Sequence, residues 1–392
     1  MVSQEDMEKA QAALASVQDD WLQRDGVTAV DLGFKWSDGQ MTDQLSIRVH
    51  VAQKKAPDAL TEADLFPKEL DGIPVDVIEA TYDIQTAIDP EWADAQLEAA
   101  VDGRGQRFDE IPLGVSIGSP RVTAGTLGAK VFDTTTREPM ILSNWHVMVG
   151  SPDTKAGDPV WQPGRLDGGT QNDVIANVSR WVLGPFDAAV AKVSGTRPVV
   201  AETVEEKPIE DVMTPRLGMF VWKSGRTTGY TEGFIDGVMM TTSLNYRSMG
   251  VRRLSSVVRV VPRPGSPPGE VSLGGDSGSI WVDAESGKAV GLHFAGEVGD
   301  APEFALANDI ISVLDHLEVV FPAQLPPEAP VEPEPPEEPI PSEPPDAPVE
   351  DPTPPEPPVA AEPPVAPTLP PPPKKQPSFW ETLLQFFRNL FK

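Results

Sequence analysis

Hydrophobic and polar positions follow a helical period at the start of this chain. Over residues 4–23 apolar side chains recur every three or four positions, which predicts an amphipathic helix. The apolar stripe consists of Met7, Ala10, Leu14, Val17 and Trp21. Strand-like runs follow at 27–36, 45–53 and 75–80, with helical signals at 62–66 and 90–101. We predict a small α+β domain over 1–106, which ends in a charged, glycine-rich stretch.

The pattern changes in the next two hundred residues. Short β-rich runs there alternate with clusters of Gly, Pro and Asp, which is typical of an antiparallel barrel. The clearest runs are 125–132, 174–182, 188–193, 219–223, 233–240, 255–261, 278–282 and 289–294. A helical stripe over 308–320 follows, with Asn308 or Asp309 as its N-cap. We predict a mainly β domain over 107–321.

The last seventy residues have two further patterns. Residues 322–377 hold 25 of the 44 prolines and eleven acidic side chains, which predicts a disordered, extended linker. Over 378–392 the apolar positions return to the 3.6-residue period, and Ser378 with Glu381 forms a capping box. We predict an amphipathic C-terminal helix. This helix binds a membrane surface, a groove on a partner protein, or the body of the same chain. We favour a membrane or a partner.

Composition limits the classes of function. The chain has 392 residues and a net charge of −29, so we expect no nucleic-acid binding, which needs a basic surface. It has no cysteine, which favours a reducing compartment. The start lacks a signal-peptide pattern, and no stretch approaches the roughly 20 apolar residues of a membrane span. We expect a cytoplasmic protein, either soluble or peripheral to the inner membrane face.

No sequence pattern indicates a cofactor. His, Asp and Glu do not occur at metal-ligand spacing, and the chain has neither a P-loop nor a dinucleotide-binding glycine motif. We therefore expect no catalytic metal and no organic cofactor.

Three segments of the second domain carry the residue types of nucleophilic catalysis. They are Ile-Leu-Ser-Asn-Trp-His-Val, Phe-Asp-Ala-Ala-Val-Ala and Leu-Gly-Gly-Asp-Ser-Gly-Ser. A serine hydroxyl needs a base within hydrogen-bond reach, and the base needs an orienting carboxylate. In chain order the segments supply His146, Asp187 and Ser277, which is the chymotrypsin-type order. We predict Ser277 as the nucleophile, His146 as the base and Asp187 as the acid that orients the base.

The glycine two residues before Ser277 has a predicted role in binding the oxyanion. Gly275 allows the backbone to turn so that its own N–H and that of Ser277 point at one spot, where they would form an oxyanion hole. We expect Asp276 to turn inward and hold the loop.

These motifs resemble those of the trypsin-like serine peptidases of the chymotrypsin superfamily, in particular cysteine-free bacterial members. The segment Lys-Ser-Gly-Arg-Thr-Thr-Gly-Tyr-Thr-Glu-Gly, 223–233, resembles a segment between the catalytic Asp and Ser of those enzymes. The helix at 308–320 matches their closing helix. The resemblance covers 113–321 and implies two six-stranded β-barrels with the triad in the cleft between them.

The resemblance also suggests where a substrate would bind. Val271 stands where trypsin has an acid, so a preference for Arg or Lys is not expected. Gly-Leu-His-Phe-Ala-Gly, 291–296, matches the strand that binds the substrate backbone, including Phe294 and Ala295. His293 either lines the specificity pocket, which would favour Gln or Glu, or is structural. We predict a serine endopeptidase acting through an acyl-enzyme on protein or peptide substrates. The alternative is a non-catalytic binding or scaffold protein on a protease fold, recruited by its C-terminal helix.

Overall fold

A computed structural model describes residues 2–37, 39–84, 99–266, 269–297 and 304–325. The chain up to Glu328 forms one compact unit. The predicted linker, except for its first four residues, and all of the C-terminal helix lie outside the described residues, as does most of the helical signal at 90–101. None of the helices in the described ranges is long and apolar enough to cross a membrane.

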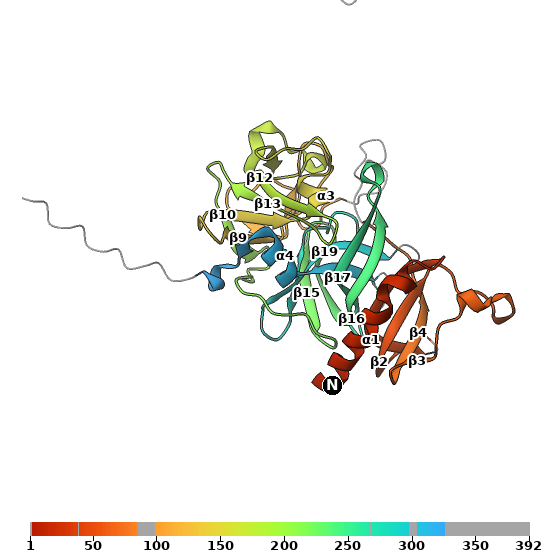
Figure 1. Ribbon diagram of the computed structural model, residues 1–392. Coiled ribbons are helices and arrows are strands. Elements are labelled where there is room, and N and C mark those ends of the chain that lie inside the picture. Colours follow the sequence, from red (N-terminus) through yellow and green to blue (C-terminus); the bar gives the residue numbers. More distant parts are fainter. Residues whose placement is uncertain (1, 38, 85–98, 267–268, 298–303, 326–392) are drawn as a thin grey trace, which may run out of the picture. The chain divides into compact units, whose positions relative to one another are not determined.

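The centre of the compact unit is a closed six-stranded barrel, named the second barrel here because most of the other strands precede it in the chain. Its strands are β15 (Phe220–Gly225), β16 (Gly229–Asn245), β17 (Val251–Pro262), β18 (Ile280–Asp283), β19 (Ala289–Glu297) and β20 (Ala305–Asp309). They pair antiparallel in the order β15-β18-β19-β20-β17-β16, and a further pairing of β16 with β15 closes the ring (Figure 1). Each predicted run from 219 to 294 falls on one of these strands.

The other half of the fold is a six-stranded antiparallel sheet, the first sheet, whose strands mostly precede the barrel in the chain. Its order is β11 (Pro159–Trp161), β12 (Val174–Leu183), β13 (Asp187–Val193), β10 (Pro139–Ser143), β9 (Ala129–Asp133) and β21 (Val319–Val320). Shorter pairs, β6 (Ile111–Leu113) with β14 (Val199–Thr203) and β7 (Ser116–Ile117) with β8 (Gly125–Thr126), flank it. The fold is therefore mainly β, a chymotrypsin-like double barrel, as the sequence predicts.

The closing helix is shorter than its apolar stripe. Helix α4 spans Ile310–Leu317, and Asp309 caps it by accepting a hydrogen bond from the backbone N–H of Ser312 at 2.8 Å. The helix ends because Glu318 takes a left-handed conformation, with φ of 52°. The next two residues then pair with β9 as strand β21, which ties the end of the described chain to the first sheet.

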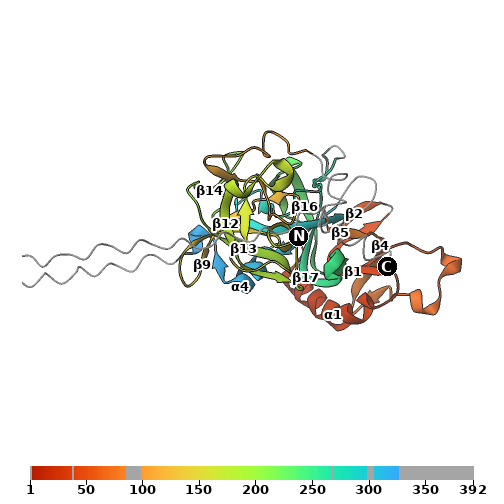
Figure 2. The ribbon, with the colours of Figure 1, turned by 90° about the horizontal axis from the view of Figure 1, so that it is seen from above.

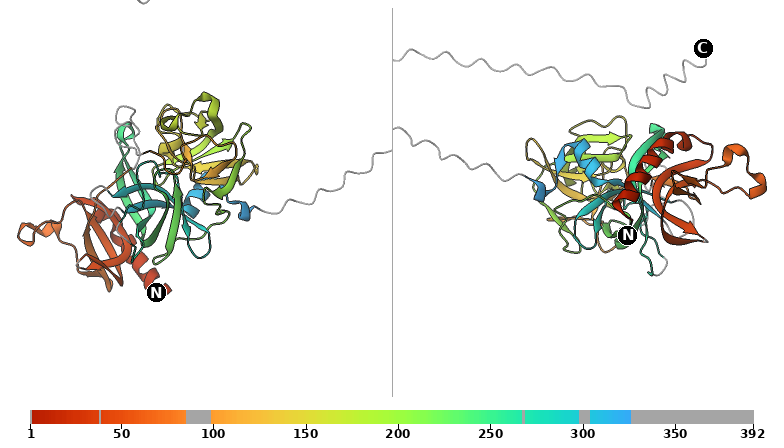
Figure 3. Two further views of the ribbon diagram at one scale, coloured as in Figure 1. Left: turned by 180° about the vertical axis from the view of Figure 1, so that it is seen from behind. Right: turned by 60° about the horizontal axis from the view of Figure 1, so that its bottom comes forward.

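The N-terminal elements form a layer on the second barrel. They are α1 (Gln4–Leu22), β1 (Val27–Ser37), β2 (Gln40–Val51), β3 (Glu69–Leu70) and β4 (Ile73–Glu79), with short 3₁₀ turns at Pro57–Ala59 and Glu62–Asp64. The second barrel lies between this layer and the first sheet (Figure 3). The predicted helix over 4–23 is confirmed, and the 62–66 signal is a single 3₁₀ turn.

The predicted boundary at residue 106 does not coincide with a break between compact units. Strand β1 pairs antiparallel with β16, so the N-terminal strands extend the sheet of the second barrel. Apolar side chains of α1, the N-terminal strands and this barrel share one hydrophobic cluster, which includes Leu14, Val30 and Val260. The layer is therefore part of the compact unit that contains the barrel.

Buried charges also join the layer to the barrel. Arg48 on β2 forms ion pairs with Asp31 on β1 and with Asp236 on β16, and Asp236 also pairs with Arg259. Burial alone would raise the pKa of Asp31, but Arg48 outweighs it and holds that pKa well below its usual value. Removing one partner from such a network would leave an uncompensated buried charge, so the network fixes how the layer and the barrel meet.

Candidate active site

The histidine and the aspartate come from neighbouring elements of the first sheet. Strand β10 ends at Ser143, and His146 lies on the short helix α3 (Trp145–Met148) that follows. Asp187 begins β13, which pairs with β10. The imidazole Nδ1 of His146 is hydrogen-bonded to Oδ2 of Asp187, and the backbone N–H of His146 donates to Oδ1 at 3.2 Å. Because Nδ1 carries the proton in this pair, Nε2 has the lone pair that a general base needs.

A tyrosine from the second barrel completes the surroundings of the carboxylate. The hydroxyl of Tyr246 donates to Oδ2 of Asp187 at 2.7 Å. Tyr246 is fully buried, and burial, followed by the charge of Asp187, raises its pKa well above the usual value, so it remains a donor. It follows β16, in the turn before β17. No motif surrounds Tyr246, and sequence reasoning missed it.

Two asparagines hold the aspartate backbone. The side chain of Asn144 donates to the carbonyl of Asp187 at 2.8 Å. Asn308, at the end of β20, accepts from the backbone N–H of Asp187 at 3.2 Å and donates to its carbonyl at 3.2 Å. The carboxylate is thus positioned from both halves of the fold.

The serine lies on a tight loop before β18. Gly275 has a φ of 99°, and a side chain there would come within 2.5 Å of the hydroxyl oxygen of Thr227, so only glycine fits. Asp276 turns inward, as the sequence predicts. It accepts from the hydroxyl of Thr228 at 2.6 Å and from the ammonium of Lys223 at 3.1 Å.

The contact between Lys223 and Asp276 gives the 223–233 segment a structural role. Burial would raise the pKa of Asp276, but Lys223 outweighs that effect and lowers it, so Asp276 is ionised. The backbone N–H groups of Thr227 and Leu273 also donate to it, at 2.8 and 3.0 Å. Lys223, Thr227 and Thr228 of this segment therefore fix the loop that carries Ser277.

The three predicted catalytic residues converge between the two halves of the fold. A Cβ placed on Gly125 would meet both the side chain of Val147, next to His146, and the carbonyl of Ser277. The side chains of His146, Asp187 and Ser277 are fully buried. Oγ of Ser277 donates to the carbonyl of Phe294 at 3.5 Å, and Nε2 of His146 has no hydrogen-bond partner among the described residues. The predicted base and the predicted nucleophile thus share no hydrogen bond in this structure, and substrate binding commonly tightens such a geometry in enzymes.

The predicted oxyanion donors are on the same loop. Within the described part of the chain, no acceptor pairs with the backbone N–H of Gly275 or of Ser277. The carbonyl of Ser277 is held by the N–H of Thr126 at 2.8 Å, and the carbonyl of Gly275 by the Thr126 hydroxyl at 2.8 Å. The loop is therefore fixed through its carbonyls while these two N–H groups stay available for a ligand.

The predicted specificity residues are all buried. His293 is fully buried and lies edge-on to Trp281, with ring centroids 6.2 Å apart, and Trp281 belongs to the same hydrophobic cluster as Val271. Burial, followed by the charge of Lys223, lowers the pKa of His293 to about 3, so the ring is neutral at physiological pH. Phe294 and Ala295 continue β19 and are buried as well.

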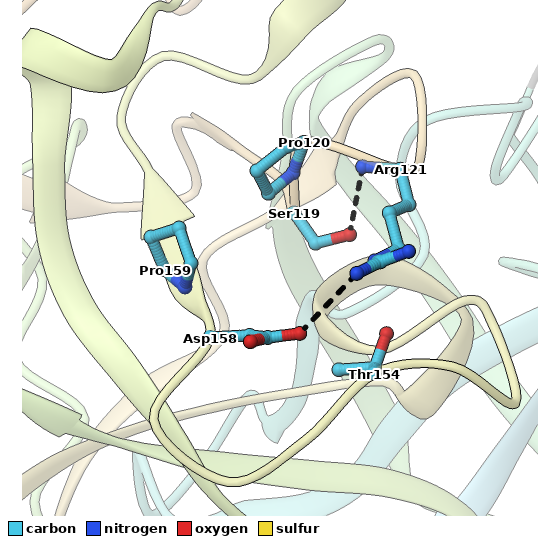
Figure 4. A pocket seen from close by; sticks show the side chains of 6 residues that line it. All are labelled: Ser119, Pro120, Arg121, Thr154, Asp158 and Pro159. Atoms are coloured by element: carbon cyan, nitrogen blue, oxygen red, sulfur yellow. Dashed lines mark hydrogen bonds and ion pairs between the residues drawn. The ribbon is translucent and has the colours of Figure 1, made fainter. Parts of the chain in front are cut away.

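A small pocket lies next to α3 (Figure 4). Its volume is about 160 Å³, and Arg121 and Asp158 form an ion pair of 3.7 Å across it. The backbone N–H of Ser119, one of its lining residues, donates to the carbonyl of Val147 at 3.1 Å. The pocket thus borders the helix of His146, but none of its lining residues belongs to the predicted triad.

No family model and no curated protein matches this chain. Solved structures do. Protease A of Thermobifida fusca is 16% identical, with a TM-score of 0.41, over 54% of this chain and 98% of that one. A Nocardiopsis protease is 17% identical, with a TM-score of 0.40 and the same coverage. A glutamic acid-specific serine protease that binds substrate with a histidine triad is 17% identical, with a TM-score of 0.41, over 54% of this chain and all of that one.

Proposed function

We propose that this protein is a serine endopeptidase in which His146, Asp187 and Ser277 form the triad. The observation that carries the proposal is the orientation of His146. Its Nδ1 is fixed by a carboxylate that itself accepts from Tyr246, which leaves Nε2 as the basic atom beside the serine loop. This is the arrangement that activates a serine hydroxyl.

The reaction follows from these positions. Oγ of Ser277 attacks the scissile carbonyl carbon while Nε2 of His146 takes the hydroxyl proton. The negative charge on the carbonyl oxygen is stabilised by the N–H groups of Gly275 and Ser277. When the C–N bond breaks, His146 returns the proton to the leaving amine, and an acyl-enzyme remains on Ser277. Water attacks this ester with His146 again as the base, which releases the acid and restores the serine.

We also propose that the enzyme does not select Arg or Lys before the scissile bond. An acid that could pair with a basic side chain is missing at Val271, which belongs to the apolar cluster. A neutral His293 can donate or accept one hydrogen bond, which suits Gln, a protonated Glu or a small polar residue. A peptide library dominated by cleavage after Arg or Lys would contradict this part of the proposal.

The cellular setting remains a proposal from the sequence. We propose a cytoplasmic enzyme that is tethered to a membrane surface or a partner protein by residues 378–392. The acidic, proline-rich stretch before them would act as a spacer.

One observation favours a second candidate, a binding protein on a protease fold. Among the described residues, Nε2 of His146 and Oγ of Ser277 do not share a hydrogen bond, and both side chains are buried. A protein that uses the fold only for binding would tolerate such a geometry permanently, whereas an enzyme must close it during turnover.

A serine-directed fluorophosphonate probe distinguishes the two functions. The full chain should be labelled on one serine, and Ser277→Ala should abolish the labelling. Ser279→Ala is a matched control, because Ser279 is a buried serine two residues away on the same loop. Labelling that persists in Ser277→Ala refutes the assignment. A well-folded chain that is neither labelled nor able to cleave a peptide library, both as wild type and as Asp83→Pro, supports the binding protein.

A further inference from the structure

Both edges of β19 are covered, but by different parts of the chain. One edge pairs with β20 along most of its length. On the other edge, β18 pairs only with the first half of the strand, from Ala289 to Leu292. The last three residues, Ala295–Glu297, pair antiparallel with a short strand from the N-terminal layer, β5 (Tyr82–Ile84).

The direction of β5 leads toward the predicted nucleophile. Tyr82 is opposite Glu297 and Ile84 is opposite Ala295, so the chain advances along β19 toward Phe294. The carbonyl of Phe294 is the group that accepts the hydroxyl of Ser277. An extended peptide substrate that pairs with this edge in the same direction would deliver its next residues to the serine. Strand β5 therefore occupies the backbone positions that a substrate would use.

Side-chain contacts anchor β5 to the N-terminal layer on one side and to the second barrel on the other. Nε2 of His50 on β2 donates to Asp31 at 3.1 Å, so Nδ1 accepts from the Tyr82 hydroxyl at 2.7 Å. Ile84 is buried in a hydrophobic cluster formed by residues of the first sheet and the second barrel. Asp83, on the opposite side of the strand, forms an exposed ion pair of 3.5 Å with Arg247. The strand thus lies where the N-terminal layer meets the second barrel, and it is held from both (Figure 2).

We propose that β5 is a built-in occupant of the substrate edge that keeps the enzyme latent until it is displaced. This rests on the proposed function, since only a peptidase has a substrate to exclude. The full burial of His146 and Ser277 agrees with a site that is closed in this state. Peptides that carry Tyr-Asp-Ile in the same register are the ligands this edge fits, and they compete with β5.

Two variants of the full chain loosen β5 to different degrees. Tyr82→Phe removes only the hydroxyl that donates to His50, and Tyr230→Phe is its matched control, an exposed tyrosine on β16. Asp83→Pro removes a backbone donor and the Arg247 ion pair from the strand itself. We expect hydrogen exchange of the Gly296 amide, which is opposite Asp83 of β5, serine labelling and peptide hydrolysis to rise together. The rise should be about fivefold in Tyr82→Phe, the effect of one ordinary hydrogen bond, and about tenfold or more in Asp83→Pro. Tyr230→Phe should change none of them.

A peptide added in trans provides an independent measurement. The sequence Ala-Thr-Tyr-Asp-Ile, residues 80–84, should inhibit the loosened variants and restore slow exchange of the Gly296 amide, and a scrambled peptide should do neither. Faster exchange without faster labelling and hydrolysis would show that β5 does not block the site. Wild-type and variant proteins that exchange, label and hydrolyse at equal rates would also overturn latency while leaving the peptidase intact. If exchange rises but no variant is ever labelled, the proposed function fails as well.

Discussion

Tyr246→Phe tests whether the second barrel helps to position the catalytic pair. The substitution removes one hydroxyl and keeps the ring that packs edge-on against Trp145, with centroids 6.4 Å apart. The lost interaction is a 2.7 Å hydrogen bond to the Asp187 carboxylate. A hydrogen bond to a charged group contributes about 1.5–3 kcal/mol, and Asp187 keeps its contacts to His146. We therefore expect kcat/KM to fall about tenfold to a hundredfold, with little change in KM.

The separate values of kcat and KM distinguish positioning from a loss of substrate binding. Tyr246→Phe should lower kcat and leave KM close to the wild-type value. The assay is the rate of fluorophosphonate labelling and of peptide hydrolysis at neutral pH, at temperatures well below unfolding. Tyr230→Phe is the control. A variant with wild-type kcat and KM would refute the positioning role of Tyr246.

Four further outcomes follow from the structure. Lys223→Met should lower the free energy of unfolding by about 3–5 kcal/mol, because it leaves Asp276 buried without its counter-charge, and denaturant titration measures this. Burial raises the pKa of Glu297 from 4.5 to about 7, so the stability of the folded protein should fall as pH rises through that interval, and thermal unfolding of Glu297→Gln should lack this fall. His293→Ala should alter the cleavage profile of a peptide library if the ring lines the pocket, and an unchanged profile would remove it from the specificity argument. The full chain should co-sediment with anionic liposomes and a chain ending at Pro322 should not, whereas equal behaviour of the two would exclude membrane tethering by the C-terminal segment.

The sequence predicts most of the fold because its signals are local. Alternating runs between turn residues identify the barrel strands, and the apolar stripe of α1 identifies its buried face. The end of α4 could not be predicted from the apolar pattern, because the apolar stripe continues past Leu317 while the backbone turns at Glu318. The pairing of β1 with β16 is equally hidden, because strands two hundred residues apart leave no mark in a local pattern. For that reason the first hundred residues read as a separate domain.

The same distinction applies to the candidate site. His146, Asp187 and Ser277 lie in short motifs whose residue types match a known chemistry, so order along the chain was enough to nominate them. Tyr246 is one tyrosine in a turn, and its role depends on how the β16–β17 hairpin reaches the first sheet. Strand β5 has three residues, too few for a periodic signal, and only its pairing with β19 reveals it.

The shared sheet has a consequence for how the chain is made. Ribosomes add about 5–20 residues per second, so β1 and β2 are synthesised about 10–40 s before β16. During that interval the edge of β1 lacks its neighbour, and Arg48 lacks the carboxylate of Asp236. An unpaired, partly apolar strand edge is a site of misassociation between nascent chains. Synthesis in cells should therefore depend on chaperones that hold the first fifty residues until the second barrel is complete.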